Sequence, residues 1–227
     1  AKLRPIVGRD ALEGLRVALL DDFRKADPLT PPTPDPALNG FLLELIVFDL
    51  HLGKLAWGEE TGTDYDLNIA VRMFRESVAA LLERARREPI QRIILPVGND
   101  FFHVDTPYAE TANGTRQDVD TRWQKAFRIG RKLISDTVRT LLEVAPVDLV
   151  VVPGNHDVQS AWFLGEVLAA EFDGVENVRI DNRPILRKPV QFERNLILYT
   201  HGKDEKRKDL PNLLAQEAPK AWGETTF

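Results

Sequence analysis

The sequence predicts a layered α/β fold, in which buried strands and longer helices alternate along the chain. Short aliphatic runs of strand length alternate with segments whose apolar residues recur at helical spacing. The expected strands are apolar almost throughout, as in a sheet that is covered on both faces. A chain of 227 residues is long enough for one substantial domain and an appendage.

The alternation begins after residue 40. Met73, Phe74 and Val78 share one side of the first long helix, and Trp162 and Phe163 are expected to be core residues of the last one. The expected strands cover residues 41–48, 91–97, 147–152 and 195–200, and the expected helices cover 68–87, 121–144 and 158–172. The polar segment 101–120 is a long loop of the kind that is often functional.

Residues 1–40 are expected to form an appendage. Leu12, Leu15 and Leu19 recur at helical spacing within 10–26, and the prolines between Pro28 and Pro36 indicate an extended linker. We therefore expect a boundary before a domain at 41–227. The appendage is interpreted as the possible tail of an upstream module that binds nucleic acid or a partner subunit.

Composition excludes several classes of protein. The chain has no cysteine, so disulfides and thiolate metal sites are ruled out. No apolar run approaches the roughly 20 residues that span a bilayer, and a cytoplasmic protein is expected. The formal charge of −5 argues against a globally basic nucleic-acid binder, although bound cations would change the local field.

Polar residues with metal-binding side chains follow four of the expected strands. Asp49 and His51 end the first, and Asp100 follows the second. Asn155, His156 and Asp157 follow the third in the sequence Gly-Asn-His-Asp, and His201 follows the fourth. Taken alone, an Asp after a strand is often a turn former, and Asp157 could simply cap the next helix.

Together these residues predict a metal site, because the carboxyl ends of strands in an α/β sheet form the ligand crevice. Two carboxylates, two imidazoles and an amide suit two divalent ions, with Mn²⁺ expected first and Fe, Zn²⁺ or Mg²⁺ as alternatives. Two such ions clamp a phosphate and lower the pKa of a shared water.

This series resembles the motifs of the calcineurin-like metallophosphoesterase superfamily over residues 41–202. The resemblance implies a β-sandwich flanked by helices on both sides. It also implies that Asp49 and His51 hold metal one, that Asp100 bridges, and that Asn155 and His201 hold metal two. His156 would stabilise the phosphate or protonate the leaving group, and Asp157 would orient His156.

The chain departs from the family pattern at two points. Asn99 stands where the family has glycine, a turn that asparagine tolerates. No Gly-His-x-His motif follows His201 before Phe227, so we interpret the sequence as C-terminally truncated and expect weakened metal binding and low or absent activity.

Asp100-Phe101-Phe102-His103 resembles a segment of the double-strand-break repair nucleases. The resemblance gives His103 a role in placing the nucleic-acid phosphate, while a loop histidine that contacts Asp105 is the alternative. Tyr108 and Arg116 are candidates for stacking on a base and meeting a phosphate, or are exposed loop residues. Lys54 is a further candidate for a phosphate contact, or an ordinary surface lysine.

The leading hypothesis is therefore a metal-dependent phosphodiesterase acting on nucleic acid, as exonuclease or endonuclease. Hydrolysis of a small nucleotide or of a phosphoprotein is the second enzymatic hypothesis. An inactive scaffold of the same fold is the third.

Overall fold

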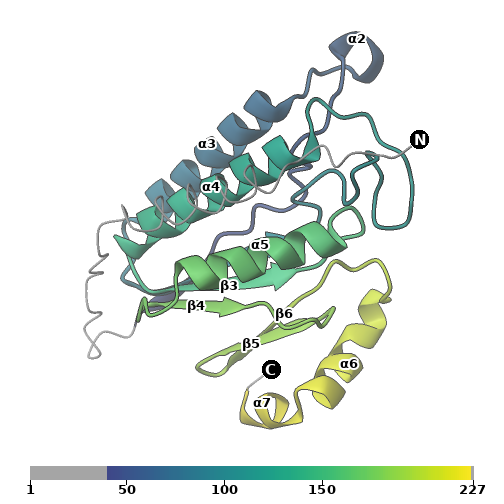
Figure 1. Ribbon diagram of the computed structural model, residues 1–227. Coiled ribbons are helices and arrows are strands. Elements are labelled where there is room, and N and C mark those ends of the chain that lie inside the picture. Colours follow the sequence, from purple (N-terminus) through teal and green to yellow (C-terminus); the bar gives the residue numbers. More distant parts are fainter. Residues whose placement is uncertain (1–39, 226–227) are drawn as a thin grey trace. The chain divides into compact units, whose positions relative to one another are not determined.

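The computed structural model describes residues 40–225 (Figure 1). The expected helix at 10–26 and the proline-rich linker lie outside the described residues. Within the described part of the chain, no helix is long and apolar enough to cross a membrane.

A four-stranded parallel sheet forms the centre of the fold and confirms the α/β prediction. Its strands, in spatial order, are β1 (Phe41–Glu44), β2 (Ile90–Gly98), β3 (Val147–Val152) and β4 (Val178–Asp181). In β2 and β3, Ile93 pairs with Val147 and Gly98 with Val152. Residues 93–98 are all buried, as expected for a strand covered on both faces.

Three long helices lie on one side of this sheet: α3 (Leu67–Ala85), α4 (Trp123–Leu142) and α5 (Val158–Glu171) (Figure 1). Each follows the predicted range to within two residues. Consecutive parallel strands are direct neighbours here, so right-handed crossovers bring all three connecting helices to the same face.

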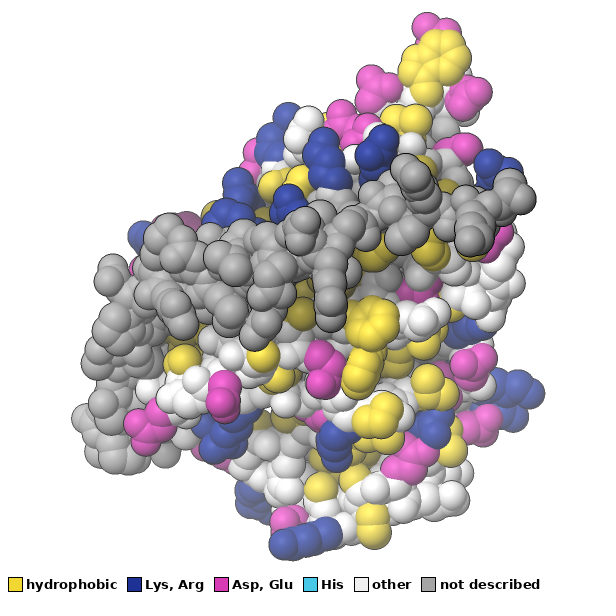
Figure 2. Space-filling view, in the orientation of Figure 1, with side chains coloured by type: hydrophobic (Ala, Val, Ile, Leu, Met, Phe, Trp, Pro, Cys, Tyr) yellow, Lys and Arg dark blue, Asp and Glu magenta, His cyan; other side chains and the backbone are white. Residues whose placement is uncertain are grey.

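The prediction that Trp162 and Phe163 are core residues was wrong. Their exposed fractions are 40% and 51%, because Ala161, Leu164 and Leu168 form the buried side of α5 instead. Hydrophobic side chains accordingly reach the surface in the region of α5 (Figure 2).

An antiparallel hairpin of β5 (Lys188–Phe192) and β6 (Asn195–Tyr199) forms a second sheet. Tyr199 of β6 is buried with Ile94, Val150 and Val152 of the parallel sheet. The predicted strand at 195–200 therefore exists, but it is not a further strand of the central sheet. His201 approaches the site from this second sheet and not from the same sheet edge as expected.

The first predicted strand is shorter than expected, since β1 ends at Glu44 and not at residue 48. The chain then runs beside the loop that follows β2: the backbone N–H groups of Asp49 and His51 donate to the carbonyls of Asn99 and Asp100. Asp49 and His51 thus lie in a loop, not at a strand end.

Several short elements were not predicted. They are α2 (Gly58–Thr61), β4, β5, the 3-10 turn η1 (Arg207–Asp209), α6 (Leu210–Glu217) and α7 (Pro219–Glu224). The last three of these, η1, α6 and α7, follow His201.

Candidate metal centre

The predicted site residues meet where β2 and β3 end. One ligand atom from each of Asp49, His51 and Asp100 lies within 4.8 Å of the others. Asn155 and His201 form a second group beside them. Side chains from segments about 150 residues apart in the sequence therefore converge, as the sequence predicted.

The backbone of the site is held in an uncommon conformation. Asp49, His51, Asn99 and Asp100 have positive φ angles of 64°, 47°, 52° and 65°. The other non-glycine residues with positive φ in the described part of the chain are Ala109 and Glu193. Such strained positions cluster at functional sites because they persist where the surroundings fix them.

Gly154 is required by the close approach of two loops. A Cβ atom at this position would lie 2.1 Å from Oδ1 of Asp100 and 2.8 Å from Oδ1 of Asp157. Both neighbours are buried carboxylates, so neither has room to move away. The glycine of the Gly-Asn-His-Asp sequence therefore gives Asp100 its place.

Asp49 and His51 form the first group, the pair that the resemblance assigns to metal one. Nε2 of His51 lies 3.1 Å from Oδ1 of Asp49. The Asp49 side chain is 74% exposed, whereas Asp100 is buried. This group therefore opens to solvent on one side and is backed by Asp100 on the other.

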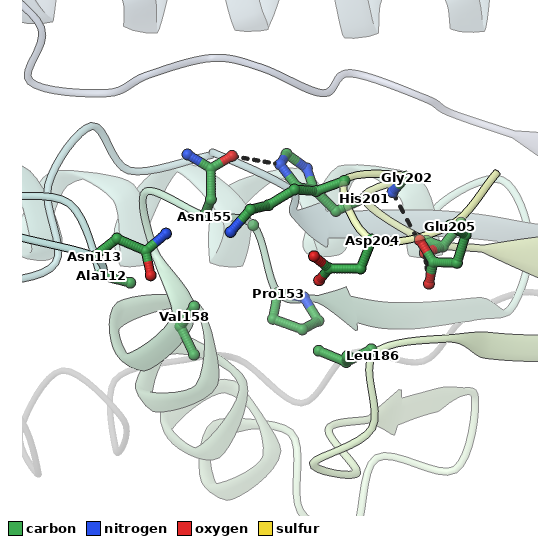
Figure 3. A pocket seen from close by; sticks show the side chains of 13 residues that line it. Ala112, Asn113, Pro153, Asn155, Val158, Leu186, His201, Gly202, Asp204 and Glu205 are labelled. Carbon is green, nitrogen blue, oxygen red and sulfur yellow. Dashed lines mark hydrogen bonds between the residues drawn. The ribbon is translucent and has the colours of Figure 1, made fainter. Parts of the chain in front are cut away.

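Asn155 and His201 form the second group, the pair that the resemblance assigns to metal two. Nε2 of His201 lies 2.7 Å from Oδ1 of Asn155 (Figure 3). The same Nε2 atom lies 3.7 Å from Oδ2 of Asp100. Asp100 thus lies between both groups, the position expected of a bridging carboxylate. Nδ1 of His201 also contacts Oδ1 of Asn99, which in the sequence stands out only as a replacement for the glycine of the family pattern.

The Asp157 carboxylate does not contact the His156 ring as the resemblance implied. It is fully buried and accepts the backbone N–H groups of Gly154, Asp100 and Phe102 at 3.1, 3.2 and 3.1 Å. It therefore ties the two ligand loops together. Burial raises the pKa of Asp157 to about 7, with the charge of Asp100 adding to the rise and the backbone N–H groups opposing it.

Asp157 does not cap the following helix through its side chain either. Asp105 does so, because its carboxylate accepts the backbone N–H groups of Gln159 and Ser160 at 2.9 and 2.8 Å. The suggested contact between His103 and Asp105 is therefore replaced by a helix cap.

His103 lies in a cluster with His51 and His156. Its Nδ1 atom is 3.1 Å from Nδ1 of His51, and its backbone carbonyl is 2.8 Å from Nδ1 of His156. Burial, followed by the neighbouring His51 and His156, lowers the pKa of His103 to about 3. Burial and His156 also lower the pKa of His51, so both rings are neutral near pH 7.

The predicted substrate-binding residues are not gathered at the site as the predicted metal ligands are. Tyr108 is 76% exposed and Arg116 is exposed in the same loop, so both face solvent. Nζ of Lys54 lies 5.9 Å from the ring centroid of Tyr65, and its charge contributes to the lowered pKa of His103. The loop reaches the site through Ala112, whose N–H donates to the carbonyl of Asn155.

A small pocket of about 90 Å³ opens beside Asn155 and His201, and Asn113 also lines it (Figure 3). Glu205 also lines this pocket, although no sequence motif marks it. The Glu205 side chain is 4% exposed, pairs with Arg187 at 2.8 Å and accepts from the hydroxyl of Thr200 at 3.2 Å. Glu205 therefore fixes Thr200, the residue before His201. These contacts join residues that no local sequence pattern connects.

Comparisons of the chain with protein-family models, with curated proteins and with solved structures returned no match.

Proposed function

We propose that this chain is a metal-dependent phosphoesterase of the calcineurin-like type that hydrolyses phosphodiester bonds, with nucleic acid as its substrate. The observation that carries the proposal is the position of Asp100, between the Asp49–His51 group and the Asn155–His201 group. Two groups of nitrogen and oxygen donors joined by one carboxylate are the arrangement that a pair of divalent ions requires.

The donor set fits such a pair. Asp49, His51 and Asp100 would hold one ion, and Asp100, Asn155 and His201 the other. The abundance of oxygen donors favours Mn²⁺, with Fe, Zn²⁺ and Mg²⁺ as alternatives. When bound, two ions supply charge for the phosphate and lower the pKa of the attacking water.

His156 is the proposed general acid. Because a carbonyl accepts only, the carbonyl of His103 holds a proton on Nδ1 of His156 and leaves Nε2 as the atom that would meet the substrate. Protonated, that Nε2 atom donates to the phosphate or to the leaving oxygen. Asp157 supports this geometry indirectly, because it fixes the loop from Gly154 onward.

The proposal also includes a sandwich-type arrangement of the two sheets and nucleic acid as the substrate. The contact of Tyr199 with the parallel sheet supports a two-layered β arrangement of the sandwich type. The sequence Asp100-Phe101-Phe102-His103 supports nucleic acid as the substrate. The exposed Tyr108 is suited to stacking on a base.

The test is an assay of the 227-residue chain with Mn²⁺ against single-stranded DNA, duplex DNA and bis-para-nitrophenyl phosphate. We expect weak Mn²⁺-dependent hydrolysis that His156→Ala lowers by about 10²–10⁴-fold, the contribution of a general acid. The matched control is Gln159→Ala, a change in the exposed first turn of α5.

Hydrolysis of the small ester without DNA cleavage would indicate a small phosphoester as the substrate. If Mn²⁺ binds but no substrate is cleaved, the scaffold hypothesis is favoured. Equal rates for His156→Ala and the unmodified chain would refute the role of His156.

A further inference from the structure

The imidazoles of His51, His103 and His156 form a compact triangle on the side of His51 that faces away from Asp49. One ring nitrogen from each lies within 4.8 Å of the others. The ring centroids are 5.1, 4.6 and 5.3 Å apart. In the metal centre described above, His51 acts through Nε2, and neither His103 nor His156 is a ligand.

Hydrogen bonds to the outer atoms of these rings determine where their lone pairs point. Nδ1 of His156 donates to the carbonyl of His103, which leaves Nε2 with the lone pair. The backbone carbonyl of Asp118 acts on the His103 ring as an acceptor and favours a proton on the nitrogen that does not face His51. Nδ1 of His103, which faces His51, is therefore left with its lone pair.

The neutral ring of His51 has one N–H group and one lone pair, so it cannot donate to Asp49 and to His103 at the same time. If its Nε2–H donates to Asp49 at 3.1 Å, the lone pairs on Nδ1 of His51 and Nδ1 of His103 face each other at 3.1 Å. A cation between them resolves that repulsion. If Nε2 instead binds metal one, Nδ1 carries the proton and donates to His103.

We propose that Nδ1 of His51, Nδ1 of His103 and Nε2 of His156 form a site for a single transition-metal ion of the Zn²⁺ type. Zn–N bonds of about 2.0–2.1 Å at tetrahedral angles place ligand nitrogens about 3.3 Å apart. They place the centroids of the rings about 5.2 Å apart. The 3.1 Å contact and the triangle of centroids are close to both values.

The two faces of His51 select different ions. Three neutral imidazoles suit Zn²⁺, Co²⁺ or Ni²⁺, whereas the carboxylate-rich face suits Mn²⁺ or Mg²⁺. A neutral imidazole has one lone pair on nitrogen, so an ion at the three-histidine site takes His51 away from metal one. Zn²⁺ bound there should therefore inhibit. This competition rests on the proposed function, while the existence of the site does not.

Co²⁺ is the direct probe, because a tetrahedral Co²⁺ site shows strong visible absorption. The 227-residue chain should develop these bands on titration, and Zn²⁺ should abolish them, since Zn²⁺ binds nitrogen sites more tightly than Co²⁺. His103→Ala should weaken Co²⁺ binding by at least about tenfold. The matched control is His201→Ala, which removes a nearby imidazole outside the triangle and should leave the bands in place.

His103 is buried, so circular dichroism must show that His103→Ala is folded, and the half-buried His156→Ala serves as a second variant. The absence of Co²⁺ bands, or bands lost in His201→Ala but kept in His156→Ala, would overturn the site.

Mn²⁺ binding followed by electron paramagnetic resonance tests the carboxylate-rich face of His51 separately. Zn²⁺ should release that Mn²⁺, and simultaneous binding of both ions would overturn the competition. A chain that binds Co²⁺ but not Mn²⁺ would keep the three-histidine site and remove the proposed function.

Discussion

Some site residues of this protein could be predicted from the sequence, and others could not. Asp49, His51, Asp100, Asn155 and His201 could be predicted because carboxylate, imidazole and amide side chains follow buried strands. Asn99 and Glu205 could not, because their roles come from contacts with His201 and Arg187 that no local pattern encodes. The positive φ angles at Asp49 and Asp100 were equally hidden, since neither residue type requires that conformation.

Gly154 gives the sharpest prediction at the scale of one atom. In Gly154→Ala the new methyl group would lie 2.1 Å from Oδ1 of Asp100 and must displace that carboxylate. We expect Mn²⁺ affinity to fall by about tenfold or more, the effect of disturbing a metal ligand. Isothermal titration calorimetry measures this change.

The control for this change is Gly223→Ala. A Cβ at Gly223 has no neighbour within 4 Å, and its φ is not in the left-handed region. That variant should bind Mn²⁺ as the unmodified chain does. Equal affinities for Gly154→Ala and Gly223→Ala would show that the position of Asp100 does not matter for the ion.

Helices and strands were predicted correctly where an apolar pattern continues over many residues. The three long helices and the strands β2 and β3 were found because each carries a sustained apolar pattern. β4 and β5 were missed because Val178–Asp181 and Lys188–Phe192 are short and contain charged residues. Their position depends on a buried lysine, Lys188, and its partner Asp181, which is a tertiary contact.

The N-terminus of α5 offers a test at this scale, because it carries His156 just before its first turn. Asp105→Ala removes the carboxylate that accepts the N–H groups of Gln159 and Ser160. We expect the free energy of unfolding to fall by about 1 kcal/mol, the usual value of a helix cap. Urea denaturation measures this loss.

Asp209→Ala is the matched control, since Asp209 is the N-cap residue of α6 but its side chain makes no capping hydrogen bond. This variant should unfold at the same urea concentration as the unmodified chain. If both variants lose the same stability, the loss reflects the removal of a surface charge and not the cap.

The ion pair between Asp181 of β4 and Lys188 of β5 links the two sheets, and we expect it to make stability depend on pH. Burial acts to raise the pKa of Asp181, but hydrogen bonds from Arg183 and the charge of Lys188 outweigh it and hold the pKa at about 2, below the ordinary value of 3.8. A carboxylate with a lowered folded pKa stabilises the fold above its unfolded pKa. That stabilisation is lost as the pH falls toward the folded pKa.

We therefore expect Asp181→Asn to be less stable than the unmodified chain by about 2 kcal/mol at pH 6. The difference should shrink as the pH falls from about 5 to 2, because the unmodified chain loses its advantage. Urea denaturation across this range measures it. A difference that stays constant with pH would contradict the lowered pKa.

For the molecule as a whole, the sequence predicted the fold class but not how its layers combine. The alternation of strands and helices indicated a parallel sheet, and the structure confirms it. It did not indicate that His201 would come from a separate hairpin packed on that sheet through Tyr199. The candidate centre is therefore assembled only when both sheets are in place, so its metal affinity should depend on global folding.

The proposed function requires that Asp49, His51, Asp100, Asn155 and His201 hold a pair of divalent ions. Crystals of the chain grown with Mn²⁺, measured at the manganese absorption edge, show whether they do. We expect two anomalous peaks about 3.5–4 Å apart, one beside Asp49 and His51 and one beside Asn155 and His201, with Asp100 between them. Peaks elsewhere on the protein, or none at these residues at saturating Mn²⁺, would contradict the claim.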